Sequence, residues 1–143
     1  MSVRSRIDDA MVLWNSGHLE GAFALALVAA AATSRRKFPS QQIGDRQAFE
    51  NFLRQGWFER LSVEFRGEAH PVYHIFYKWF RCELVHEGAL PIDIQFMDDP
   101  EPGSLSIRAG GAPEYILKIS RGWFHELVHI VRNADVNKGL FEN

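Results

Sequence analysis

The chain has 143 residues, the usual length of one domain, and its 46% apolar residues, with 11 Phe and 4 Trp, can fill a core. This composition excludes a disordered chain, and a net charge of −2 excludes a general polycation, so an RNA partner would have to meet a local basic patch. The single cysteine, Cys82, excludes an internal disulfide and a thiolate-rich metal site, and it indicates a reducing, cytoplasmic compartment.

The first half of the chain predicts helices. A short helix fits the pattern from Ile7 to Trp14, with Asp8 and Asp9 near its positive N-terminal end. An Ala-rich helix is expected from His18 to about Arg36. Its apolar run, residues 22–32, is shorter than the roughly 20 residues that cross a bilayer, so we expect a buried helix and no membrane partner.

A third helix is predicted after Asp45, its candidate cap. Its apolar stripe consists of Ala48, Phe49, Phe52, Leu53 and Trp57. Residues 58–68 fit a strand or a loop equally well. The clearest helix begins near Pro71 and ends before Gly88, with a broad apolar face formed by Val72, Ile75, Phe76, Trp79, Phe80 and Leu84.

Beyond Pro91 the apolar residues alternate, which is typical of strands. Three strands are expected, around Ile92, Ile94 and Phe96, around Leu105 and Ile107, and around Tyr115, Leu117 and Ile119. With Pro- and Gly-rich turns between them, they predict a small antiparallel β-meander over about residues 92–119. Ser120 is the expected cap of a last helix from Arg121 to about Asn133. The predicted fold class is therefore mainly α, a helical bundle in one domain over residues 1–143, with the meander inserted before the C-terminal helix.

Arg81 and His86 form the most credible chemical site. Five positions amount to about 140° of helical rotation, so the two long side chains can converge on a shared groove. Arg holds a phosphate through paired hydrogen bonds, and His exchanges a proton near neutral pH. Glu83 and Tyr77 lie about one turn away, where they could orient the pair. Spacing alone also fits a structural role, with Arg81 paired to a neighbouring glutamate.

This arrangement resembles the HEPN superfamily, small helical bundles with an Arg-x4–6-His motif late in the bundle. Arg81 and His86 match the motif, and the small residues from Ala22 to Ala32 resemble the family's opening pair of helices. The resemblance covers roughly the first 90 residues and loosely the last helix. The family commonly places a polar residue, often Asn, directly after the Arg, where this chain has Cys82.

The resemblance implies a metal-independent endoribonuclease of a toxin or phage-defence type, working without a cofactor as a homodimer. Arg81 would bind phosphate and His86 would act as general acid/base. The alternative that it leaves open is a non-catalytic module that binds a nucleotide or a protein.

Two further pairs of histidines lie four residues apart in the sequence. His125, Glu126 and His129 match the HExxH pattern of zinc hydrolases. However, we expect the helix that carries them to bury its other face, which leaves both histidines in solvent. In addition, Arg132 occupies the position where the metzincin group of zinc peptidases needs Gly for a sharp turn. His70 and His74 are also four residues apart, and we expect a capping His at 70 and a surface His at 74.

Overall fold

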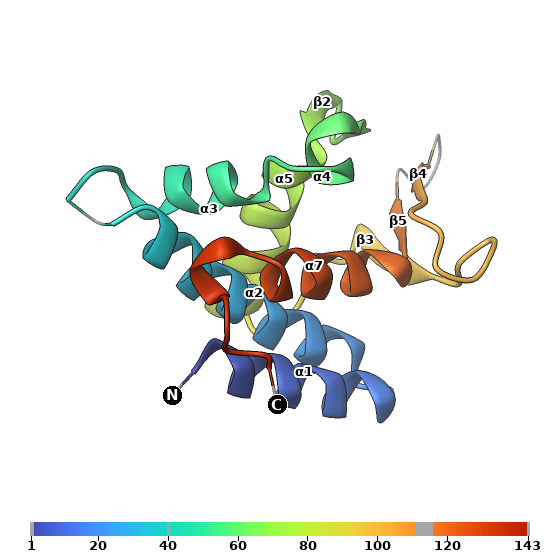
Figure 1. Ribbon diagram of the computed structural model, residues 1–143. Coiled ribbons are helices and arrows are strands. Elements are labelled where there is room, and N and C mark those ends of the chain that lie inside the picture. The colour runs from blue at the N-terminus through green and yellow to red at the C-terminus, as the bar shows by residue number, and fades with distance from the viewer. Residues whose placement is uncertain (1, 40, 111–115, 143) are drawn as a thin grey trace. The chain divides into compact units, whose positions relative to one another are not determined.

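The computed structural model describes residues 2–39, 41–110 and 116–142 (Figure 1). Helices account for 55% of the structure, and two small sheets make up the rest of its regular elements in these ranges. The chain divides into two compact units. One contains the described residues up to Leu53 and from Glu126 onward, and the other runs from Arg54 to His125. The single domain over residues 1–143 stays a prediction.

Helix α1 (Val3–Asn15) begins four residues earlier than the sequence predicted. The reason is its cap, because the hydroxyl of Ser2 accepts a hydrogen bond from the backbone N–H of Ser5 at 3.1 Å. Asp8 and Asp9 therefore lie inside the helix and not in its first turn. There Asp9 pairs with Arg6 at 2.9 Å, one turn back along the helix.

Helix α2 (Leu19–Lys37) packs against α1 and against α3 (Asp45–Leu53) within the first unit. Its small residues let the neighbouring helices approach closely, and the predicted burial of this Ala-rich run is confirmed at Ala22, Ala26, Ala29 and Ala30. Across the residues that the structure describes, no helix is both long and apolar enough to cross a membrane.

The sequence predicted that Trp57 belongs to the apolar stripe of α3, but in the structure it does not. The helix ends at Leu53, and Gly56, at φ +55°, redirects the chain into a new turn, α4 (Trp57–Arg60). The indole of Trp57 is 46% exposed, and the guanidinium of Arg60 lies 5.5 Å from its ring centre.

In the second unit, most of the segment that fitted a strand or a loop equally well, residues 58–68, belongs to a β-hairpin. Its strands are β1 (Ser62–Phe65) and, antiparallel to it, β2 (Glu68–Pro71). Phe65 is opposite Glu68, so the turn contains only Arg66 and Gly67. Both have positive φ, +53° and +85°, which gives the twist that suits a two-residue hairpin turn. A non-glycine residue such as Arg66 rarely adopts this conformation.

The predicted antiparallel meander is wrong. Strands β3 (Ile94–Met97), β4 (Ile107–Ala109) and β5 (Leu117–Ser120) do form a sheet, but in the order β3-β5-β4, with β3 parallel to β5 and β4 antiparallel to it. The most buried strand, β5, takes the centre, where both of its edges are paired. The segment between β3 and β4 is long enough to leave that central position open. Tyr115, a residue of the predicted third strand, lies outside the described residues.

The last helix, α7 (Gly122–Arg132), is not capped by Ser120. The Ser120 hydroxyl is buried and bonds to the backbone of the segment before β4. It donates to the carbonyl oxygen of Ser104 and accepts from the N–H of Ser106. Instead, the carboxylate of Asp99 accepts a hydrogen bond from the Gly122 N–H at 2.8 Å. This cap is distant in sequence, so the local pattern could not reveal it.

Candidate functional site

The helix that carries the predicted motif is continuous from residue 72 to residue 86, but it is not a regular α-helix. It consists of α5 (Val72–Ile75), a π-helical segment η1 (Phe76–Arg81) and α6 (Cys82–His86). The N–H of Cys82 donates to the carbonyl oxygen of Tyr77, five residues back. The rings of Phe76 and Phe80 stack within this wide turn, with centres 4.5 Å apart. Wide turns of this kind occur frequently at functional sites.

Arg81 is held against an aromatic ring at the end of the π-helical segment. Its guanidinium lies 5.8 Å from the ring centre of Tyr77, within the range of a cation–π interaction. The Arg81 side chain is half-buried, so part of it remains open to solvent. The structure thus brings together two of the four predicted site residues.

Glu83 lies in the electrostatic field of a different arginine. The Arg66 guanidinium donates two hydrogen bonds to Asp93, at 2.8 and 2.9 Å. These bonds raise the pKa of Arg66, and the negative charges of Asp93 and Glu83 raise it further. The same hydrogen bonds hold the pKa of Asp93 below its ordinary value. Glu83 therefore contributes negative charge close to the hairpin turn.

His86 is the last residue of α6 and is exposed. Within the part of the chain that the structure describes, its imidazole has no hydrogen bond, ion pair or ring contact. An exposed imidazole without a partner can exchange protons with a bound ligand. The four predicted residues thus lie on one helix, with Tyr77 and Arg81 in contact and His86 accessible at its end.

The HExxH residues lie where the sequence predicted them. His125 and His129 are exposed on α7, whereas Trp123, Phe124, Leu127, Val128 and Val131 are buried. Among the residues that the structure describes, no three His, Cys, Asp or Glu side chains lie close enough together to hold a metal ion. The wet face of this helix therefore carries surface histidines, and Asn133 donates a hydrogen bond to the backbone of one of them, His129.

His70 is not a helix cap, contrary to the sequence prediction, and its ring contacts two other rings. It lies in β2, only 15% of its side chain is exposed, and α5 has Pro71 as its cap residue with no side-chain hydrogen bond. Its ring stacks on His74 with centres 5.4 Å apart and meets the edge of Trp79 at 4.9 Å. Burial lowers the pKa of His70, and the neighbouring His74 lowers it further.

This histidine–tryptophan cluster is the feature that sequence reasoning missed. The spacing of the three residues could have indicated the cluster. Trp79 lies about one and a half helical turns after His74, and His70 reaches the same side only if a strand leads directly into the helix. Arg66 and Lys78 cover the Trp79 ring from 5.8 and 5.0 Å. The cluster is consequently packed on Trp79 in the core of this unit.

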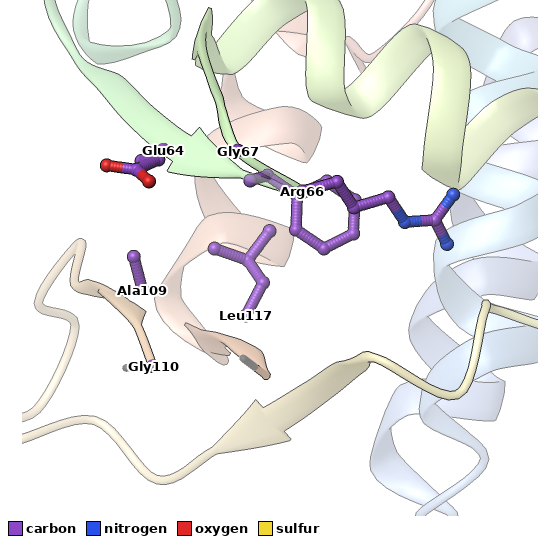
Figure 2. A pocket seen from close by; sticks show the side chains of 7 residues that line it. Glu64, Arg66, Gly67, Ala109, Gly110 and Leu117 are labelled. Carbon is purple, nitrogen blue, oxygen red and sulfur yellow. The ribbon is translucent and has the colours of Figure 1, made fainter. Parts of the chain in front are cut away.

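A cavity of about 200 Å³ lies between the hairpin and the mixed sheet (Figure 2). Its lining comes from the hairpin and from β4 and β5, and consists of Glu64, Phe65, Arg66, Gly67, Ala109, Gly110 and Leu117. Figure 2 shows the side chains of Glu64 and Arg66 directed to opposite sides, away from Leu117. None of the predicted site residues lines it, so the cavity and the Arg81–His86 motif are separate features.

The geometry defines a predominantly helical protein with two small sheets and an arginine–histidine motif on one partly π-helical helix. The chain belongs to the Rv1289 family, which residues 2–140 match. Comparison with curated proteins gives no match, and comparison with solved structures gives none either.

Proposed function

We propose that this protein is a HEPN-like helical bundle that acts on RNA through Arg81 and His86. The observation that carries the proposal is the exposed imidazole of His86, which has no partner among the described residues, on the same helix as an arginine that lies over the ring of Tyr77. Support comes from chemistry, because phosphodiester cleavage is accelerated by charge stabilisation and by proton transfer, which a guanidinium and an imidazole can supply.

In the proposed reaction, the ribose 2′-oxygen attacks the neighbouring phosphorus and the bond to the 5′-oxygen breaks. An imidazole takes the proton of the 2′-hydroxyl, and a protonated imidazole returns one to the leaving 5′-oxygen. Arg81 donates hydrogen bonds to the phosphate oxygens and offsets the negative charge that develops there. A homodimer that brings two motifs together would supply both imidazoles.

The test is incubation of the untagged protein with mixed RNA in EDTA, comparing the wild type with His86→Ala. His125→Ala is the matched control, because it removes an exposed imidazole from a different helix. We expect cleavage by the wild type and by His125→Ala, and none by His86→Ala with an unchanged circular dichroism spectrum. Equal cleavage by all three proteins would refute the role of His86.

A second candidate function, a non-catalytic module that binds a nucleotide or a protein partner, is favoured by one feature. The residue directly after Arg81 is the half-buried Cys82, where the HEPN motif commonly carries a polar residue. This candidate predicts no cleavage by any variant, together with weaker binding of a nucleotide such as AMP by Arg81→Ala. Binding that Arg81→Ala leaves unchanged would refute it.

A further inference from the structure

A second cavity, of about 250 Å³, lies in the first unit, between the beginning of α1 and the end of α2. Ser2, Val3 and Arg6 line it from one side, and Val28, Ala32 and Arg36 from the other. At about 30 Å³ per water molecule, this is space for roughly eight waters. Among the described lining residues, Val3, Val28 and Ala32 are aliphatic and the two charged ones are both arginines.

The guanidinium groups have unused hydrogen-bonding capacity. The Nη2 atom of Arg6 pairs with Asp9 at 2.9 Å, but its Nε is buried and has no acceptor among the described residues. Because this atom has almost no accessible surface, a ligand in the cavity does not reach it, and the hydrogen-bonding capacity open to the cavity is that of Arg36. Arg36 is exposed and takes part in no hydrogen bond, ion pair or ring contact within the same part of the chain.

The neighbouring arginine behaves differently, which sets Arg36 apart. Arg35 donates hydrogen bonds to the carbonyl oxygens of Phe38 and Ile43 and also pairs with Asp45. Arg35 is therefore committed to the end of α2 and the segment that follows it. Arg36, one position later, faces the cavity with its charge available.

From these contacts we propose that the cavity binds a medium-chain aliphatic carboxylate. Its carboxylate oxygens accept hydrogen bonds from Arg36 beside the positive charge of Arg6, and its chain lies against Val3, Val28 and Ala32. Carboxylate geometry matches the forked donors of a guanidinium. The described lining residues include no aromatic ring on which a nucleobase could stack, so these walls favour an aliphatic ligand over a nucleotide. The site is independent of Arg81 and His86.

The experiment is calorimetric titration of the full chain with octanoate, inorganic phosphate, 1-octanol and AMP. We expect octanoate to bind at least about tenfold more tightly than the other three, because each of them lacks either the anion or a chain that fits. Phosphate or octanol binding as tightly as octanoate, tighter binding of AMP, or no binding of octanoate would each overturn the proposal.

Variants separate the arginine contact from a general charge effect. Arg36→Gln should weaken octanoate binding about tenfold, since it removes a charged hydrogen bond. Arg108→Gln, which removes an exposed arginine of β4, should leave it unchanged. Ala32→Leu fills the cavity and should weaken binding while the circular dichroism spectrum stays the same. Equal affinity of Arg36→Gln and the wild type would overturn the assignment.

Discussion

The ion pair between Arg66 and Asp93 allows a quantitative test of how the hairpin turn is held. In buried surroundings, charged hydrogen bonds such as these two contribute about 1.5–3 kcal/mol each to stability. Here the Arg66 side chain is 50% exposed and that of Asp93 is 27% exposed. Solvent screening at that exposure reduces the contribution of the whole pair to about 1 kcal/mol.

A double-mutant cycle with Arg66→Gln and Asp93→Asn measures this coupling in urea unfolding at pH 7. Glutamine keeps the strain of the positive φ at position 66, so the strain cancels within the cycle. A control cycle on Arg54 and Glu59, 3.4 Å apart and 50% and 47% exposed, should give about 0.5 kcal/mol or less, because that contact is single, longer and more exposed.

The coupling should also depend on pH in one direction. The hydrogen bonds from Arg66 hold the pKa of Asp93 below its ordinary value of 3.8. Because the pKa is lower in the folded than in the unfolded chain, the stabilisation is complete above pH 3.8 and is lost as the pH falls through the folded-state pKa. A coupling near zero at pH 7, or an Asp93 carboxyl that titrates by NMR at or above 3.8, would refute the reasoning.

Three further predictions concern single side chains. Asn137→Ala should lower the free energy of unfolding by about 2 kcal/mol, since it removes two buried hydrogen bonds, one of them to the Thr33 hydroxyl, and urea unfolding measures this. Gly122→Ala should cost about 1–3 kcal/mol, because its Cβ would lie 2.3 Å from the carbonyl oxygen of Ser104; a Tm equal to that of the wild type would contradict it. Burial lowers the pKa of His70, so its contribution to stability is complete above pH 6.5 and is lost as the pH falls through its folded-state value; in His70→Gln, Tm should fall less over that range.

Local patterns explain why the helices were more predictable than the sheet. The apolar stripes of α3 and α7 indicate which face of each helix is buried, and residues that end helices, such as Gly88 after α6, lie next to them in sequence, although the cap of α7 does not. Strand order has no such local record. That β5 takes the centre follows from its burial and from the length of the segment before β4, so the alternating pattern located the strands and misassigned their pairing.

In the candidate site, too, the helix was predictable from the sequence and a contact between elements was not. The sequence predicted the helix that carries Arg81 and His86, because its apolar face is regular. The sequence did not predict the cluster of His70, His74 and Trp79. These rings meet only if the end of β2 faces the helix that follows it. Contacts across a junction between a strand and a helix depend on the direction in which the chain turns, which spacing does not specify.

The π-helical turn is the least expected feature of the motif helix, and the core does not account for it. Phe76, Phe80 and Leu84 are spaced to form one stripe of a regular α-helix, so their burial requires no wide turn. In an α-helix the carbonyl oxygen of Tyr77 would accept from the N–H of Arg81, four residues on, whereas here it accepts from Cys82. The widening therefore alters the backbone at the residues of the proposed site. The contact between Arg81 and Tyr77 does not require the wide turn either, since residues four apart also meet on a regular α-helix. What the extra residue in the turn changes is the placement of the residues that follow it, Cys82–His86, relative to Arg81.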